Sequence, residues 1–179
     1  MLILVGPSAS GKTQILQVLI KEYGMEKLVT YTTRKMRVNE VEGRDYHFIS
    51  LEEFERKIKN NFFFEYVLYN GNYYGTAKND LADHKAVILE PQGLQKYLDE
   101  ARDKVTVLVI RCSKEILRIR MLNRGDDIDS VNARLISDSV IFSKDLYTKA
   151  DYVIDSSASN IYSDAKTIYQ YYQKALRNK

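Results

Sequence analysis

A short apolar run near the start of the chain is followed at once by a glycine-bounded loop. Leu2–Val5 is entirely aliphatic, and the next eight residues read Gly6-Pro7-Ser8-Ala9-Ser10-Gly11-Lys12-Thr13. This fits the pattern G-x-x-x-x-G-K-[ST] in the context the motif requires, since a strand pattern precedes it and a helical pattern follows. Small residues let backbone N–H groups curl around a polyphosphate, and the N-terminus of the next helix adds partial positive charge. The sequence therefore predicts a buried strand, a phosphate-binding loop and a helix in succession.

The later apolar runs and helical stripes alternate along the chain. Ala86–Leu89 and Val105–Ile110 are apolar on both faces, as in a parallel sheet that helices cover on each side, and Asp151–Ile154 is a weaker strand candidate. Apolar residues at helical spacing predict helices over Gln14–Tyr23, Gln92–Arg102, Ser113–Asn123 and Ile161–Leu176. This alternation predicts an α/β fold with a parallel sheet at its core.

One long segment interrupts the alternation. Residues 30–76 are polar and rich in turns, with short strand patterns at Tyr46–Ile49, Phe62–Tyr69 and Asn72–Thr76. Asn70-Gly71 between the last two is typical of a hairpin turn, and Leu51–Asn60 has a helical period. These features predict a small mixed α/β lobe inserted into the parallel sheet.

Composition excludes several classes of protein. The 179 residues suffice for one domain, and 27 Lys and Arg against 24 Asp and Glu leave a net charge of +3, which does not indicate a nucleic-acid binder. No apolar run approaches the roughly 18 residues needed to span a bilayer, and Met1–Gly6 lacks the features of a secretory signal. We expect a cytoplasmic protein that binds neither nucleic acid nor membrane.

The cysteine and histidine residues do not indicate a disulfide or a metal site. Cys112 is the single cysteine, which excludes an internal disulfide, and it is predicted to be a small buried hydrophobe. His47 and His84 show no metal-ligand spacing with each other.

The loop itself carries chemistry. Lys12 is expected to reach the β- and γ-phosphates of a nucleotide, and the Thr13 hydroxyl to ligate Mg²⁺ bound with ATP. All eight residues from Gly6 to Thr13 are thus candidate ATP contacts. The loop indicates a phosphate donor and leaves the acceptor open.

Several further motifs follow the loop in a characteristic order. They are Thr30-Tyr31-Thr32-Thr33-Arg34-Lys35-Met36-Arg37, Glu42-Gly43-Arg44-Asp45-Tyr46-His47-Phe48, Phe64-Glu65-Tyr66 and Gly71-Asn72-Tyr73-Tyr74-Gly75-Thr76. With the phosphate loop, this order closely resembles the guanylate kinase family, from Leu2 to about Ser156. The resemblance implies one domain: a P-loop core (1–29, 80–112 and 150–179), an acceptor-binding lobe (30–79) and a helical lid region (113–149).

The resemblance implies a binding site for the acceptor GMP. Arg34 and Arg37 match the pair that grips its phosphate, and two guanidinium forks suit a phosphate dianion. Tyr46 and Tyr74 match the tyrosines that complete this grip. Without the resemblance, these arginines are better explained as a solvated face and the tyrosines as core packing.

The base is implied to meet a carboxylate. Glu65 matches the residue that accepts from N1–H and the 2-amino group of guanine, a donor pair that adenine lacks. Thr30 and Thr76 match positions with a hydroxyl near the base, and Glu90 stands where the family has an aspartate that helps hold the acceptor. Ordinary strand-end or turn residues are an equal alternative for the last three.

The lid is implied to supply cations to the transferring phosphoryl group. Arg120, Arg124 and Arg134 match the lid arginines and join Lys12 as catalytic candidates, whereas Arg118 is better explained as a surface charge. The implied reaction is ATP + GMP (or dGMP) giving ADP and GDP, through positioning, water exclusion and charge neutralisation. The protein is expected to be a monomer or a homodimer.

Three departures from the family leave alternatives open. Ile88 replaces a usual acidic residue, so the family's outer magnesium–water network is not implied. The lid between Arg124 and Arg134 is one residue shorter than is usual in the family. Ser156 replaces an asparagine that is common in the family. These departures imply slower catalysis or a shifted substrate. The alternative functions are a kinase of another small phosphorylated acceptor on the same scaffold and a non-catalytic guanylate kinase-like binding module.

Overall fold

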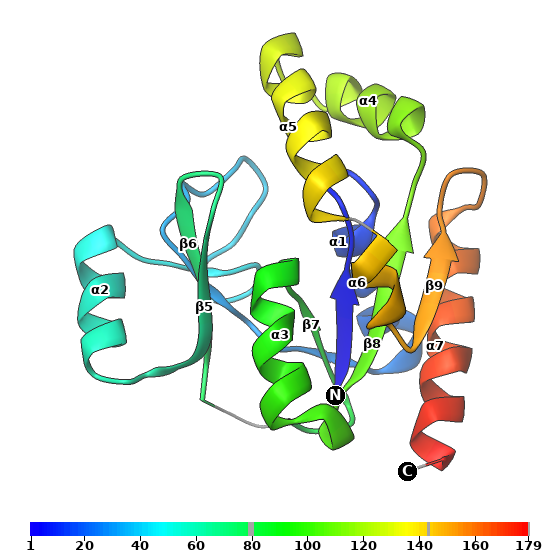
Figure 1. Cartoon of the computed structure of the whole chain (residues 1–179), viewed down its shortest axis with the longest axis horizontal. Helices are drawn as coiled ribbons and strands as arrows, with labels where there is room; N and C mark the ends of the chain where they lie inside the picture. Colours follow the sequence, from blue (N-terminus) through cyan, green and yellow to red (C-terminus); the bar gives the residue numbers. More distant parts are fainter. Residues whose placement is uncertain (79–80, 143, 179) are drawn as a thin grey trace.

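The computed structural model describes residues 1–78, 81–142 and 144–178 (Figure 1). Its strands are β1 (Leu2–Val5), β2 (Glu26–Lys27), β3 (Tyr31–Thr32), β4 (His47–Phe48), β5 (Phe63–Tyr69), β6 (Asn72–Ala77), β7 (Lys85–Ile88), β8 (Thr106–Arg111) and β9 (Tyr152–Asp155). Its helices are α1 (Lys12–Tyr23), α2 (Leu51–Lys59), α3 (Pro91–Glu100), a 3₁₀ turn η1 (Arg102–Lys104), α4 (Lys114–Asn123), α5 (Ile128–Ile141), α6 (Lys144–Thr148) and α7 (Ile161–Arg177).

A parallel sheet in the order β2-β7-β1-β8-β9 forms the core. Every side chain of β1 is buried, because helices cover the sheet on both faces. Ile3 and Val5 pack toward α3 and α6 on one face, while Leu2 and Leu4 pack toward α1 and α7 on the other (Figure 1). The predicted fold class is confirmed. The phosphate loop consequently leaves the carboxyl end of a strand held in the middle of the sheet.

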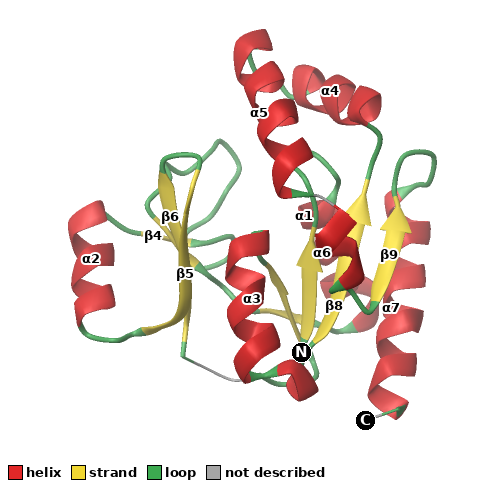
Figure 2. Ribbon diagram, in the orientation of Figure 1, coloured by secondary structure: helices red, strands yellow, loops and turns green. Residues whose placement is uncertain are grey.

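The second sheet, in the order β4-β3-β6-β5, is mixed and lies beside the core (Figure 2). We call residues 30–78 the mixed-sheet lobe. Asn70 and Gly71 both have positive φ, 48° and 74°, as the predicted hairpin turn requires. Phe54 of α2 stacks on Phe63 and Tyr73 at centroid distances of 4.4 and 5.1 Å, so the lobe has an aromatic core of its own.

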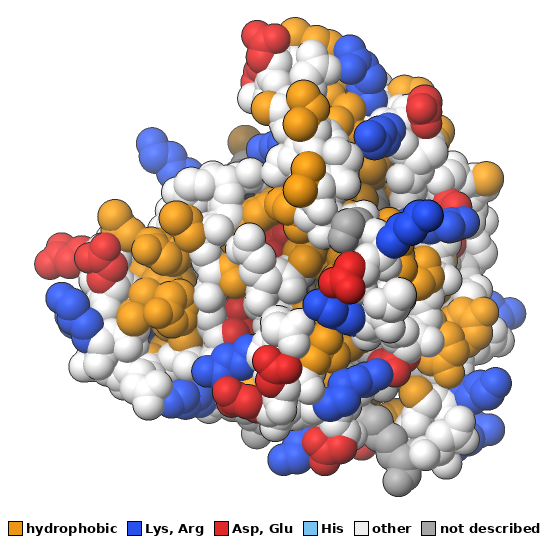
Figure 3. Space-filling model, in the orientation of Figure 1, with side chains coloured by type: hydrophobic (Ala, Val, Ile, Leu, Met, Phe, Trp, Pro, Cys, Tyr) orange, Lys and Arg blue, Asp and Glu red, His pale blue; other side chains and the backbone are white. Residues whose placement is uncertain are grey.

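Helices α4 and α5 project together from the carboxyl edge of the parallel sheet (Figure 1). We call residues 113–142 the helical arm. Ser113 and Asp127 cap the two helices through their side-chain oxygens, and Leu117, Met121 and Val131 form a small cluster between them. The arm leaves apolar side chains of α5 in solvent: Ile136 is 69% and Val140 73% exposed, and Figure 3 shows hydrophobic side chains along this helix.

Most predicted elements agree with the structure within one or two residues. The predicted helix over Gln92–Arg102 is too long, since α3 ends at Glu100 and Arg102 begins the 3₁₀ turn. Cys112 is half-buried rather than fully buried, because it lies beyond the end of β8 against the cluster of the arm. The predicted boundary between lobe and core, at 79 and 80, lies outside the described residues, as do 143 and 179.

Within the described part of the chain, no helix is both long and apolar enough to cross a membrane.

Candidate active site

Backbone geometry shapes the phosphate loop. Ala9 and Gly11 have positive φ, 62° and 96°, and Ser10 N–H donates to the Pro7 carbonyl at 3.2 Å. A Cβ atom on Gly6 would lie 2.5 Å from the Ile110 carbonyl oxygen, so only glycine lets the loop pass this close to β8. The folded chain therefore holds the loop in a defined curve from which α1 starts.

Lys12 lies half-buried inside this curve. Its Nζ donates to the carbonyl oxygens of Gly6 and Pro7 at 2.6 and 2.9 Å. Burial lowers the pKa of Lys12, and the charges of Glu90 and Asp138 oppose that lowering. The burial of Glu90 raises the pKa of its carboxyl, which Lys12 in turn pulls down. The Lys12 amine at the loop is thus within electrostatic reach of two carboxyl groups, those of Glu90 and Asp138.

Asp138 is a site residue that the sequence analysis missed. This side chain of α5 is 4% exposed; its Oδ2 accepts from Ser8 N–H and its Oδ1 from the Tyr69 hydroxyl of β5, both at 2.9 Å. One carboxylate thereby joins the arm, the phosphate loop and the mixed-sheet lobe. The available signal was its place in the stripe Val131, Leu135, Asp138, Phe142, where an acid occupies an otherwise apolar face.

Arg120 of α4 is held against the phosphate loop. Its Nη1 donates to the Ala9 carbonyl at 3.4 Å and its Nη2 to the Ser156 carbonyl at 2.9 Å. The Ser156 hydroxyl is buried and donates to the Ser10 carbonyl at 3.1 Å. The departure at Ser156 therefore ties the chain after β9 to the loop.

The other two predicted arginines of the arm share one carboxylate. Arg124 Nε lies 3.0 Å from Asp126 Oδ1, and Arg134 Nη1 lies 3.3 Å from Asp126 Oδ2. Arg124 and Arg120 line a pocket of about 420 Å³ together with the loop residues from Ala9 to Thr13. Arg134 is not among the lining residues and reaches this group only through Asp126. Arg118 bonds Asn132 of α5 at 2.7 Å, a contact within the arm.

In the mixed-sheet lobe, Arg34 and Arg37 converge on Glu40. Arg34 Nη2 lies 2.7 Å from Glu40 Oε1, and the Arg37 backbone N–H donates to Glu40 Oε2 at 2.7 Å. These bonds lower the pKa of Glu40 against the opposing effect of its burial. Glu40 is a second residue that the sequence analysis missed, and its partners become visible only in the fold.

Aromatic rings surround the Arg34 guanidinium. Its Cζ lies 5.4 Å from the Tyr46 centroid, and the Tyr74 ring lies 6.1 Å from that of Tyr46. Burial raises the pKa of Tyr46 to about 12, so its hydroxyl keeps its proton at neutral pH. A pocket of about 200 Å³ extends from these groups to the phosphate loop. Its lining includes Thr13, Lys27, Thr30, Arg37, Tyr46 and Ile88. The two pockets meet at Thr13.

Glu65 lies at the far side of the mixed-sheet lobe, against α3. A register shift in β5 between Phe63 and Glu65 sets the direction of this side chain, which is 7% exposed. The Thr76 hydroxyl donates to Glu65 Oε1 at 2.5 Å. Burial raises the pKa of Glu65 to about 7, against the lowering effect of Thr76. A carboxylate that titrates near neutrality is typical of a functional site.

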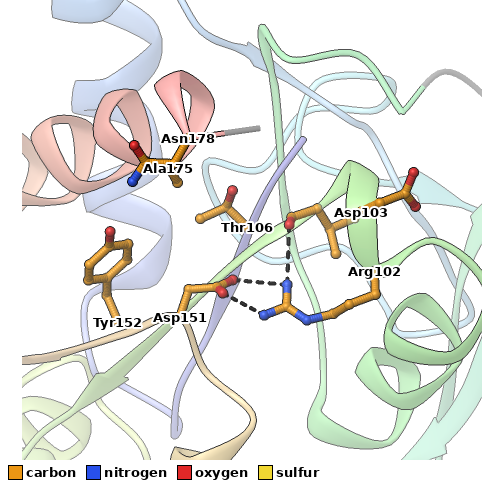
Figure 4. A pocket seen from close by; sticks show the side chains of 8 residues that line it. Arg102, Asp103, Thr106, Asp151, Tyr152, Ala175 and Asn178 are labelled. Atoms are coloured by element: carbon orange, nitrogen blue, oxygen red, sulfur yellow. Dashed lines mark hydrogen bonds and ion pairs between the residues drawn. The ribbon is translucent and has the colours of Figure 1, made fainter.

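A further pocket lies elsewhere. It has a volume of about 590 Å³ and opens beside Thr106 and Tyr152, at the amino ends of β8 and β9 (Figure 4). Two of its charged groups already pair with each other: Arg102 Nη1 donates to Asp151 Oδ2 at 3.2 Å, and the Val107 N–H donates to the same oxygen at 2.7 Å. The phosphate loop lies at the opposite, carboxyl edge of the sheet.

Comparisons with known proteins decide the family. The model of the guanylate kinase family matches residues 1–171. The chain belongs to the guanylate kinase family. It is 35% identical over 138 residues to the guanylate kinase of Blochmanniella floridana, covering 72% of this chain and 66% of that relative, just under two thirds of its length. It is 36% identical over 140 residues to that of Fusobacterium nucleatum, covering 74% and 76%.

A solved guanylate kinase shows the same fold. The crystal structure from Anaplasma phagocytophilum superposes with a TM-score of 0.75 at 27% identity, over 97% of this chain and 84% of that chain. Guanylate kinase membership therefore rests on sequence and fold together. The structure brings Lys12 and Arg120 to the phosphate loop and Arg34, Tyr46 and Tyr74 to one cluster, while Glu65 stands apart from both.

Proposed function

We propose that the protein is an ATP:GMP phosphotransferase. The observation that carries this proposal is the arrangement of three groups: a phosphate loop with its lysine and an arginine cluster in the mixed-sheet lobe, whose pockets meet at Thr13, and a buried carboxylate in the same lobe against α3. In this proposal the first two groups bind the phosphates of ATP and GMP, and the third binds the guanine base. In this proposal residues 30–79 hold the acceptor, residues 113–149 act as the lid, and the remaining segments form the core.

The donor would bind at the loop from Gly6 to Thr13. Lys12 would move from its contacts with the Gly6 and Pro7 carbonyls to the β- and γ-phosphates of ATP. Arg120 already lies at the loop, and Arg124 lines the same pocket. Arg134 joins them once Asp126 releases it. The attacking oxygen belongs to a phosphate that is already anionic, so the reaction needs no strong general base.

The acceptor would bind in the mixed-sheet lobe. Arg34, Arg37, Tyr46 and Tyr74 surround the site for its phosphate, and Glu65 with Thr76 faces N1–H and the 2-amino group of guanine. Thr30 lines the pocket between the loop and the arginines, and the charge of Glu90 acts on both Lys12 and Glu65, so we assign Glu90 to the region between the phosphates and the base. Closure of lobe and arm would exclude water.

The loop also suits a magnesium ion. Mg²⁺ prefers oxygen ligands and keeps several waters, so one protein hydroxyl with phosphate oxygens is a sufficient donor set. The Thr13 side chain is exposed where the two pockets meet, which fits this role. Held there by Thr13, the ion would supply positive charge that offsets the negative charge of the nucleotide phosphates. Ile88 lines the neighbouring pocket with an apolar side chain, so the metal would keep fewer carboxylates nearby than in relatives that carry an acid there.

The proposal predicts the outcome of an acceptor panel. With ATP and Mg²⁺, GMP and dGMP are expected to be phosphorylated fastest, IMP more slowly because it lacks the 2-amino group, and AMP and a sugar phosphate not measurably. A coupled ADP assay measures the rates. Preference for a sugar phosphate would favour the alternative kinase, and ATP binding without transfer to any acceptor would favour a binding module.

We propose that the protein acts in the cytoplasm on small nucleotides, as a monomer or a homodimer, without nucleic-acid or membrane partners. The absence of spanning helices in the described residues is compatible with this location.

A pH dependence follows from the burial of Glu65. Only the ionised carboxylate accepts both guanine donors, and burial raises its pKa to about 7. We therefore expect kcat/KM for GMP to level off above about pH 7.5 and to fall below pH 7, approaching about tenfold per pH unit. The Glu65→Gln variant is the control: its profile lacks this step but keeps the titration of the GMP phosphate near pH 6. Identical profiles would exclude Glu65 as the titrating group.

A further inference from the structure

Two residues one turn apart on α3 form the wall behind Glu65. Gly93 and Tyr97 are both buried, and their spacing of four places them on one face of the helix. A Cβ atom on Gly93 would lie 2.5 Å from Glu65 Oε2 and 3.1 Å from its Cδ. The Glu65 carboxylate therefore lies in the space that any larger side chain at position 93 would take.

Tyr97 lies one turn further along the same wall. Its side chain is fully buried, and its ring packs on Phe64, the neighbour of Glu65, at a centroid distance of 4.6 Å. Burial and the Glu65 charge both raise the pKa of the phenol, while the Thr76 hydroxyl opposes them. The phenol is thus close enough to the Glu65–Thr76 pair to feel both groups.

The Tyr97 hydroxyl has no hydrogen-bond partner among the residues that the structure describes. A buried hydroxyl without a partner opposes folding, so its presence in a core position calls for an explanation. The Thr76 oxygen offers one. It donates its own hydrogen to Glu65 Oε1, and its lone pairs can still accept from a second donor.

We propose that Gly93 and Tyr97 are positioning residues for base recognition, an inference that rests on the proposed function. Gly93 sets the place of the Glu65 carboxylate. When guanine is bound, the Tyr97 hydroxyl donates to Thr76 and completes a hydrogen-bond chain that ends on Glu65. Such a chain favours the ionised carboxylate, which is the form that accepts from N1–H and the 2-amino group.

Gly93→Ala tests the first part. The added Cβ displaces the carboxylate, so KM for GMP is expected to rise by about tenfold or more, while kcat and KM for ATP stay within about twofold. A double-mutant cycle with Glu65→Ala shows whether the effect passes through the carboxylate. If it does, Gly93→Ala changes KM for GMP little in the Glu65→Ala background. An equal increase in both backgrounds would overturn the role of Gly93.

Tyr97→Phe tests the second part and keeps the packing of the ring. We expect KM for GMP to rise by about threefold to tenfold, and the pH midpoint of kcat/KM for GMP to move upward, because the ionised carboxylate loses support. Tyr172→Phe is the matched control. Tyr172 is equally buried, but its hydroxyl donates to the Asp83 carbonyl, which lies away from Glu65.

The outcomes separate this inference from the proposed function. A protein that phosphorylates GMP, but whose Tyr97→Phe variant has the same pH midpoint and KM as Tyr172→Phe, would overturn the role of Tyr97 and leave the function intact. A wild-type protein that ignores GMP would overturn the proposed function itself. Thermal unfolding of each variant confirms that the comparisons are made on folded protein.

Discussion

Lys12→Ala is expected to reduce kcat for GMP phosphorylation by about 10³-fold or more. Lys12 lies at the centre of the loop; burial lowers its pKa, and the charges of Glu90 and Asp138 oppose that lowering. Alanine leaves the developing charge on the phosphates without this donor. Steady-state turnover measures the loss, and circular dichroism shows whether the fold is kept.

Lys21→Ala provides the control for this experiment. Lys21 lies on the same helix with its side chain 79% exposed, and its ion-pair neighbour is the adjacent Glu22. Its removal costs the same net charge and is expected to leave turnover unchanged. Equal turnover of Lys12→Ala and wild type would reject the role assigned to Lys12.

Arg34→Met is expected to raise KM for GMP by about 10²-fold to 10³-fold. In the proposed binding mode the change removes a donor to the acceptor phosphate, and it also releases Glu40. That carboxylate is now paired with Arg34 at 2.7 Å and would face the incoming phosphate with its charge uncompensated. Both effects weaken binding, so the loss is expected to exceed that of a single hydrogen bond.

The double variant Arg34→Met/Glu40→Gln separates the two effects. Removing the Glu40 charge is expected to recover about tenfold of the lost affinity for GMP. Arg56→Met, on α2 of the same lobe, serves as the control for a lost arginine and should leave KM unchanged. If the double variant binds GMP no better than Arg34→Met, Glu40 does not act through its charge.

The parallel core was predictable from sequence because its signal is local. Four-residue aliphatic runs such as Leu2–Val5 need helices on both faces, and the loop motif fixed where the central strand ends. The two-residue strands β2 and β3 carry no such pattern and were not predicted. Their backbone pairing is decided by neighbouring strands, β7 and β6, that lie far along the chain.

The candidate site likewise contains some residues that a local pattern predicts and others that it does not. The loop from Gly6 to Thr13 is contiguous and was found directly, whereas the positions of Arg34 and Glu65 became meaningful only through family resemblance. Asp138 and Glu40 were not predicted as site residues because they belong to no motif. The apolar stripe around Asp138 marks it as unusual, but its partners Tyr69 and Ser8 are distant in sequence, and Glu40 meets Arg34 through a turn conformation, so the sequence does not reveal these contacts.

The bonds of Asp138 make the mixed-sheet lobe, the helical arm and the phosphate loop thermodynamically interdependent. Swinging the mixed-sheet lobe away from the arm strips a buried anion of its phenol donor, and shifting the arm strips it of the Ser8 N–H. A ligand that takes the Ser8 N–H would leave the Tyr69 hydroxyl as the remaining donor to Asp138 of these two. By linkage, the occupant of one pocket changes the free energy of rearranging the other, with no contact between the two ligands.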